Sequence, residues 1–345
     1  MPEPATATGV EPITTDTRTG SHLVAGVLRQ ELARDPSVIL FGEDVARLGG
    51  VFGATRQLSR EFGAERVFDT PVSETAFVGM AVGAAQAGLR PVVELMFVDF
   101  AGVCFDQLVN QLAKNHYMAG GRVRLPVVVR AAAGSIGSAA QHSQVLGATF
   151  AHFPGLKVVF PGSHGDLQRL LVTAIRDDNP VVFLEHKRLL KARVDGLPLI
   201  DALPAGEAVE PAPLGRLRQV RRGSDLTIVT AGWMVQESLK AADALGLRGI
   251  SAAVVDIRTL VPLDRDGLAE VAGQARHLLV VDEDYTSYGM AAEVVCTIAE
   301  RLGPAGPRMA RIGLDVPLPA SRPLEDEVLP GSRMITDAAT ALVAG

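Results

Sequence analysis

The chain is poor in cysteine and carries little net charge, and each shortage excludes a class of protein. Cys104 and Cys296 are the only cysteines among 345 residues. A disulfide framework is therefore not expected, and the simplest interpretation is two buried thiols in a reducing compartment. The formal net charge is −6 and no segment concentrates Lys and Arg. This charge pattern gives no electrostatic footprint for nucleic acid.

Neither a signal peptide nor a membrane span is predicted. Residues 1–20 are rich in Thr and Pro and lack the cationic start and apolar core of a signal peptide. We expect a flexible arm there. The most apolar stretch, residues 75–97, is interrupted by Gln86, Arg90 and Glu94, which excludes it as a bilayer span. These features predict a cytoplasmic protein without a membrane partner.

Short motifs that identify several enzyme classes are also missing. No GxGxxG follows a predicted strand, so a nicotinamide-binding Rossmann site has no support. The P-loop, HExxH and CxxC patterns are absent, as is the GxSxG elbow of serine hydrolases. Any catalytic site must therefore use residues outside these patterns.

The residues that are present predict an α/β fold of two domains. Apolar runs rich in β-branched residues, such as 37–42, alternate with segments of helical period, such as 21–35. This alternation is typical of mostly parallel sheets covered by helices. Residues 191–223 are rich in Pro and Arg without a clear period, and we expect a linker there. The two predicted domains span residues 21–190 and 224–345.

Three polar segments directly follow predicted strands, which is where ligands bind in open α/β sheets. They are residues 42–44, residues 69–74 and the loop that carries residues 141–144. Glu74 stands at the start of a helix that Ser73 is placed to cap. Its local position fits a first-turn acid that complements the helix dipole as well as it fits a catalytic carboxylate.

The other candidate residues also have ordinary interpretations. His142 lies in a loop rich in Gly and Ala, and a solvated loop histidine is the simpler interpretation. Such loops nevertheless often bring backbone close to a ligand. Glu43 fits an acidic turn at a strand end, and Phe100 fits a core aromatic. The local sequence leaves all of these alternatives open.

Several motifs in a fixed order are more specific than any one of them. They are GEDV at 42–45, DTPVSE at 69–74, FDQLVNQLAK at 105–114, AAQHSQ at 139–144 and VDIRTLVPLD at 255–264. From about residue 21 to the end, the chain resembles the E1 β subunits of pyruvate, branched-chain 2-oxo acid and acetoin dehydrogenases. These are transketolase-like enzymes that use thiamine diphosphate. The resemblance implies a pyrimidine-binding domain followed by a transketolase C-terminal domain.

The resemblance also implies roles for individual residues. Glu74 matches the glutamate that hydrogen-bonds N1′ of the aminopyrimidine, so that the 4′-nitrogen of the imino tautomer removes the C2 proton. His142 matches the histidine that faces the substrate and the dihydrolipoyl arm. Phe100 matches the aromatic that stacks on the aminopyrimidine, and Met96 falls at a cofactor-binding position. Glu43 matches an acid in the polar path between the two cofactors.

Metal ions and partner chains are implied in the same way. Backbone positions of a structural potassium site match Val127, Ala174, Asp177 and Asn179. The chain has no GDG stretch with a downstream Asn, the pattern that binds Mg²⁺ and diphosphate in thiamine enzymes. In the family a separate α chain carries that pattern. The resemblance therefore implies an α₂β₂ heterotetramer with each active site between an α and a β chain.

The implied activity is that of an E1 component. It decarboxylates a 2-oxo acid, or cleaves acetoin, and reductively acylates a lipoyl-bearing E2. Two alternatives stay open: transfer of a two-carbon ketol unit to a carrier protein, and a non-catalytic scaffold chain. ELMFVDFAGVCFDQ and FLEHK favour acetoin, whereas the short loop after Asp44 and the stretch AAAGSIGSAAQH depart from known members. The substrate is left open.

Overall fold

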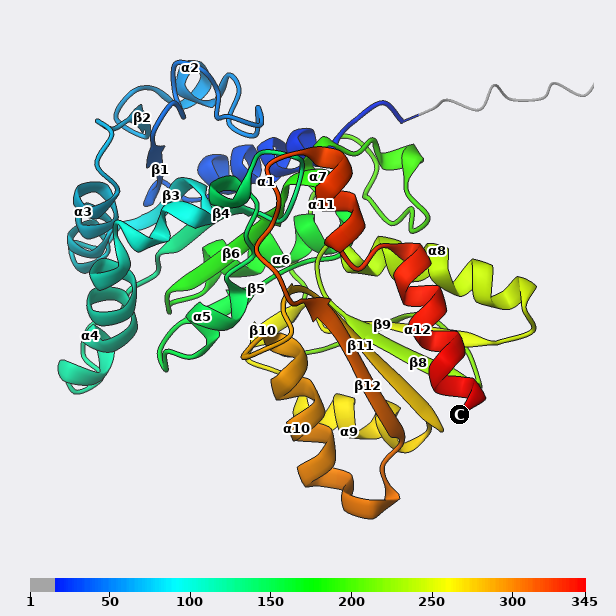
Figure 1. Ribbon diagram of the computed structural model, residues 1–345. Coiled ribbons are helices and arrows are strands. Elements are labelled where there is room, and N and C mark those ends of the chain that lie inside the picture. The colour runs from blue at the N-terminus through cyan, green and yellow to red at the C-terminus, as the bar shows by residue number, and fades with distance from the viewer. Residues whose placement is uncertain (1–15) are drawn as a thin grey trace, which may run out of the picture.

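The computed structural model describes residues 16–345 and contains two mostly parallel sheets flanked by helices (Figure 1). Within those residues, the first sheet has the strand order β10-β5-β6-β4-β3-β1-β2 and the second has the order β12-β11-β8-β9-β7. All pairings are parallel except β10 with β5 and β7 with β9. The predicted fold class is confirmed.

The first part of the chain supplies the elements around the first sheet. In chain order they are α1 (Gly20–Arg34), β1 (Val38–Gly42), α2 (Leu58–Phe62), β2 (Val67–Asp69), α3 (Glu74–Gln86), β3 (Arg90–Phe97), η1 (Val98–Gly102), η2 (Gln107–Leu112), α4 (Ala113–Met118), β4 (Val128–Ala133), η3 (Ala140–His142), α5 (Gly147–Ala151), β5 (Lys157–Val159), α6 (His164–Arg176), β6 (Val181–His186), α7 (Lys187–Lys191) and η4 (Val194–Gly196).

The second part supplies the second sheet and one strand of the first. Its elements are β7 (Arg218–Arg221), β8 (Leu226–Thr230), α8 (Met234–Leu247), β9 (Ala252–Asp256), β10 (Thr259–Val261), α9 (Arg265–Gly273), β11 (His277–Tyr285), α10 (Met290–Leu302), η5 (Gly303–Ala305), β12 (Arg308–Leu314), α11 (Arg322–Val328) and α12 (Ser332–Ala344).

The first sheet is buried on both faces, which explains why its strands are apolar throughout. All five residues of β1 are buried, and successive side chains enter different core clusters. Leu40 packs with residues of α1 and α6, whereas Phe41 packs with residues of α3 and η2. A strand covered on both sides needs apolar residues at every position rather than at alternate ones.

Two short strands lie across the expected domain boundaries. β7 falls inside the segment expected to be a linker, yet it pairs with β9 at the edge of the second sheet. β10 comes from the second part of the chain but pairs with β5 of the first sheet. Both are short, and only their tertiary pairing defines them as strands.

Part of the expected N-terminal arm belongs to the folded protein. The backbone oxygen of Arg18 accepts a hydrogen bond from the backbone N–H of Val194 at 2.9 Å, and Gly20 already begins α1. Thr19 forms an isolated antiparallel bridge with Arg193. The rest of the arm, residues 1–15, lies outside the described residues.

The expectation that both thiols are buried is confirmed for one cysteine and wrong for the other. Cys104 is buried, but Cys296 is exposed. In α10 the buried positions include Val294 and Ile298, and Cys296 lies between them on the opposite side of the helix. The apolar residues that neighbour Cys296 in the sequence therefore lie on the buried face of α10, opposite to Cys296. Among the described residues, none of the helices combines the length and the apolar character needed to cross a bilayer.

Candidate active site

The carboxyl ends of four adjacent strands carry the predicted catalytic and cofactor residues. Glu43 follows β1 directly, and the loop after β2 leads to Glu74. Phe100 lies just beyond β3, and the loop after β4 contains His142. These strands are neighbours in the order β4-β3-β1-β2. Because they are parallel, all four segments emerge at one edge of the sheet, as expected for a ligand site.

Glu74 is the first residue of α3, and its side chain is half-buried. Ser73 occupies the N-cap position as predicted, but its side chain makes no capping hydrogen bond. The helix buries one face, which includes Phe77 and Val78. The opposite face, which includes Met80 and Gly83, is exposed in the single chain. In the single chain this helix is therefore buried on one face only.

Glu43 lies beside the start of this helix in a buried position, with 7% of its surface exposed. Burial raises the pKa of the Glu43 carboxyl, and the negative charges of Glu74 and Asp44 raise it further. A backbone hydrogen bond from Ser73 acts in the opposite direction. One carboxylate oxygen, Oε1, has no hydrogen-bond partner among the described residues. Glu43 and Glu74 are thus neighbouring acidic side chains at the strand ends.

The aromatic residues beyond β3 pack against His142. The ring of His142 lies edge-on to Phe97 at 5.1 Å and to Phe100 at 5.6 Å between ring centres. Phe97 and Phe100 also contact each other edge-on at 5.5 Å. The structure therefore brings His142 and Phe100 together, although they are far apart in the sequence. Met96 instead lines a small cavity next to Phe52 and Arg130.

The loop that carries His142 is held by residues that the sequence did not single out. Lys187 donates hydrogen bonds to the backbone oxygens of Gly134 and His142 at 2.6 and 2.7 Å. Asp99 accepts two hydrogen bonds from Gln144, from the backbone at 3.2 Å and the side chain at 3.0 Å. The sequence feature that points to Lys187 is its position directly after a buried strand, in the stretch FLEHK.

Comparisons with known proteins agree with this geometry. Residues 16–193 match the transketolase pyrimidine-binding domain, and residues 215–335 match the transketolase C-terminal domain. The chain belongs to the transketolase-like family, among the E1 β subunits. An acetoin:2,6-dichlorophenolindophenol oxidoreductase subunit beta from Cupriavidus necator is 43% identical, with 92% of this chain and 94% of that protein covered.

Two further relatives are named as pyruvate dehydrogenase E1 component β subunits, and one solved structure shares the fold. The pyruvate dehydrogenase E1 component subunit beta of Rickettsia felis is 40% identical, over 90% of this chain and 94% of that protein. The human mitochondrial subunit is 38% identical, over 87% of this chain and 84% of its own length. A solved split-gene transketolase, described as an inactive beta4 tetramer, shares the fold with a TM-score of 0.75. It is 21% identical and covers 94% of this chain and 98% of that chain.

The four residues matched to a potassium site lie at the other edge of the sheet. Arg90, at the start of β3, donates to the backbone oxygen of Asp177 at 2.6 Å. The backbone oxygens of Val127 and Ala174 accept hydrogen bonds from Val181 and Asp177. Burial alone would raise the pKa of Asp177, but hydrogen bonds from Lys157 and Asn179 lower it below its usual range. This segment is therefore separate from the carboxyl-edge site.

Among the described residues, no group of three or more His, Cys, Asp or Glu side chains is arranged to hold a metal ion.

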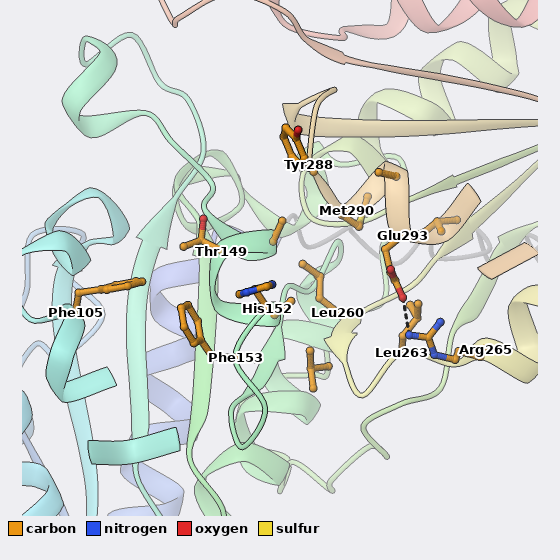
Figure 2. A pocket seen from close by; sticks show the side chains of 16 residues that line it. Phe105, Thr149, His152, Phe153, Leu260, Leu263, Arg265, Tyr288, Met290 and Glu293 are labelled. Carbon is orange, nitrogen blue, oxygen red and sulfur yellow. Dashed lines mark hydrogen bonds and ion pairs between the residues drawn. The ribbon is translucent and has the colours of Figure 1, made fainter. Parts of the chain in front are cut away.

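A groove of about 720 Å³ lies between residues of the two sequence segments of this E1 β chain. It lies between α5 on one side and β10 and α10 on the other (Figure 2). Figure 2 shows Phe153 and His152 facing Leu260, with the Arg265–Glu293 ion pair beyond. Neither Glu74 nor His142 lines this groove. This groove is therefore separate from the predicted catalytic residues.

Proposed function

We propose that this chain is the β subunit of a thiamine-diphosphate-dependent E1 component. The complex decarboxylates a 2-oxo acid, or cleaves acetoin, and transfers the acyl unit to a lipoyl-bearing E2. The observation that carries the proposal is the position of Glu74. It begins α3 at the edge where Glu43, Phe100 and His142 also emerge. The relatives named as acetoin and pyruvate dehydrogenase β subunits support the same conclusion.

The described residues fit the aminopyrimidine half of the cofactor. An aminopyrimidine needs an acid at N1′ and an aromatic face to stack on, and Glu74 and Phe100 supply these groups. The unpartnered Oε1 of Glu43 is a buried acceptor that a bound polar group or water would satisfy. Buried polar atoms without partners are rare in folded proteins, so an orphan beside Glu74 supports a ligand at this position.

The residues of this chain have distinct tasks in the proposed reaction. Thiamine diphosphate, when bound, supplies the thiazolium that stabilises negative charge next to a carbonyl. Glu74 holds a proton in a hydrogen bond with N1′, which is general acid–base catalysis relayed through the ring. Phe100 orients the pyrimidine. His142 faces the substrate and donates a hydrogen bond during transfer to the acceptor.

Half of the active site belongs to an α chain in this proposal. The exposed face of α3, with Met80 and Gly83, provides an apolar surface beside Glu74 on which another chain can pack. Mg²⁺ and the diphosphate are bound mainly by that α chain in an α₂β₂ heterotetramer. We also propose a potassium ion at the backbone of Val127, Ala174, Asp177 and Asn179, and a cytoplasmic location.

The first test is an activity measurement on the complex with the α chain encoded beside this one. The purified complex should reduce 2,6-dichlorophenolindophenol in the presence of thiamine diphosphate with pyruvate, a branched-chain 2-oxo acid or acetoin. Glu74→Gln should lower this rate by ~10²-fold or more, because the amide no longer shares a proton with N1′. Glu65→Gln, at an exposed position, is the matched control. Full activity of Glu74→Gln would refute the mechanism.

A further inference from the structure

Lys187 is a buried lysine at the end of β6 and the first residue of α7. None of its surface is exposed. Its ammonium group donates to the backbone oxygen of Gly134 at 2.6 Å and to that of His142 at 2.7 Å. These two oxygens belong to the first residue after β4 and to the candidate catalytic histidine. One charged group therefore joins the two ends of the loop that spans residues 134–142.

The same ammonium group also contacts the aromatic surface under His142. Its Nζ atom lies 5.4 Å from the centre of the Phe97 ring. Phe97 in turn packs edge-on against the imidazole of His142 at 5.1 Å. Lys187 thus constrains His142 from two directions, through its backbone oxygen and through the ring on which its side chain rests.

The residues on either side of Lys187 hold the beginning of the loop. Arg188 donates to the backbone oxygen of Ser135 at 2.9 Å. The His186 ring fills the space beside Gly134, where an added Cβ would come within 2.1 Å of Nε2. Gly134 also has a φ of +79°, so this position requires glycine on both grounds. The loop therefore starts from a rigid base, and its far end depends on Lys187.

An ordinary ion pair does not explain this lysine. Within residues 16–345 its hydrogen bonds go to backbone oxygens, and no carboxylate is close enough to form an ion pair. Lysine is rarely buried unless it is paired. Burial lowers the pKa of Lys187 to about 8, against the opposing charges of Asp99, Glu283 and Glu325. A buried ammonium that opposes folding in this way is more easily explained by a task at the site.

We propose that Lys187 is a positioning residue that fixes the 134–142 loop and thereby orients His142 for transfer of the acyl unit to the acceptor. This inference rests on the proposed function, in which His142 serves the acceptor step. Lys187 does not touch the substrate, and it acts through His142. Its loss should therefore affect the step that uses His142 more than the step that uses Glu74.

The test compares two reactions of the complete αβ complex. Reduction of 2,6-dichlorophenolindophenol reports substrate cleavage, and acylation of a free lipoyl domain reports the acceptor step. Lys187→Met removes the charge and both hydrogen bonds while keeping an unbranched side chain. We expect acylation to fall ~10- to 10²-fold, as for a misplaced catalytic group, and dye reduction to change less than about threefold. An equal loss in both reactions would overturn the proposal.

The matched control is Lys191→Met. Lys191 ends the same helix, is exposed and lies 5.7 Å from the Phe52 ring centre. Both reactions should keep nearly wild-type rates in this variant. If Lys187→Met does not assemble, Lys187→Gln retains a donor in a neutral side chain and is measured in the same way. An acylation rate equal to that of Lys191→Met would overturn the proposal.

A double-mutant cycle separates positioning from a general structural role. In a His142→Ala background, Lys187→Met should change acylation less than about twofold, since the group it orients is gone. The same fold-loss in both backgrounds would show that Lys187 acts independently of His142 and would refute the proposal. Loss of acylation in Lys187→Met but not in His142→Ala would refute the acceptor role of His142 as well.

Hydrogen–deuterium exchange of the full chain gives a readout that needs no activity. Peptides that cover residues 134–144 should exchange faster in Lys187→Met than in wild type, whereas Lys191→Met should leave them unchanged. Unchanged exchange in Lys187→Met would overturn the inference even if the enzyme is active. Faster exchange in a complex without thiamine-dependent activity would support the loop contact and refute the proposed function instead.

Discussion

Two groups of buried charged side chains differ in how completely they are paired. Arg130 of β4 lies between Glu94 of β3 and Glu185 of β6. Its guanidinium donates two hydrogen bonds to Glu185, both at 2.8 Å, and one to Glu94 at 2.9 Å. This group, which we call the Arg130 cluster, spans three neighbouring strands and satisfies the guanidinium on both sides.

The second group lies at the carboxyl edge and is incompletely paired. Glu43 and Asp99 at this edge, and Glu325 of α11, each have at least one buried carboxylate oxygen without a partner among the described residues. A buried polar atom without a partner destabilises a fold by about 1–3 kcal/mol. The Arg130 cluster has no such atom. The comparison teaches that the paired charges of the Arg130 cluster hold strands together, whereas the unpaired charges of Glu43 and Asp99 mark the edge that we assign to the cofactor and the α chain.

The largest expected effect on stability belongs to the Arg130 cluster. Arg130→Met leaves Glu94 and Glu185 buried without a positive charge between them. We expect the free energy of unfolding to fall by ~3–5 kcal/mol. Urea denaturation followed by circular dichroism measures this change. Adding Glu94→Gln and Glu185→Gln should recover part of the loss, because the uncompensated charges are removed. A stability loss below about 1 kcal/mol would break the comparison.

Glu31 gives a smaller effect with a defined pH dependence. Its buried carboxylate accepts from Arg176 at 2.8 and 2.9 Å and from Arg34 at 2.9 Å, which joins α1 to α6. Burial alone would raise the pKa of Glu31, but hydrogen bonds from Arg176, Gln30 and Arg34 lower it below its usual value. The folded state therefore binds fewer protons than the unfolded state as pH falls below about 4.5, and the stability from this pairing is lost there.

Glu31→Gln should accordingly lower the free energy of unfolding by about 1.5–3 kcal/mol at pH 7. The difference from wild type should shrink as pH falls below the usual pKa of a glutamate. Chemical denaturation at pH 7 and pH 4 measures both values. Glu61→Gln, which removes an exposed ion pair with Arg29, is the control and should cost less than about 1 kcal/mol. A pH-independent difference would contradict the assignment.

Compared with Arg130→Met and Glu31→Gln, Glu43→Gln should change the stability of the fold least and the activity of the complex most. The Oε1 atom of Glu43 has no partner to lose, and its raised pKa means that ionisation opposes folding at neutral pH. We expect a stability change within about 1 kcal/mol, and of either sign. Dye reduction by the αβ complex should fall by ~10-fold or more if Glu43 relays protons between active sites. If Glu43→Gln proved as unstable as Glu31→Gln but kept normal activity, Glu43 would not be part of the active site.

The sequence predicted those parts of the structure that depend on local pattern. The βα alternation and the motif order were enough for both sheets, the helix that begins at Glu74 and the loops at the strand ends. The division of the segment after β3 between η1, η2 and α4 leaves no such pattern in the sequence. The exposed Cys296 was wrongly expected to be buried because its apolar neighbours face the other way. Lys187 was missed because its partners are backbone oxygens, which leave no trace in a side-chain pattern.

The pairing of β10 with β5 has a consequence for attempts to recombine this protein with its relatives. β10 belongs to the segment matched by the C-terminal family but completes the edge of the first sheet. A chimera joined between the two family segments would pair one parent's β5 with the other parent's β10. Excising the first segment alone would leave β5 as a bare edge, open to pairing with another molecule. The two segments therefore have to be exchanged together. A chimera that takes the first sheet from one parent must also take β10 from that parent, because β10 forms the edge of that sheet.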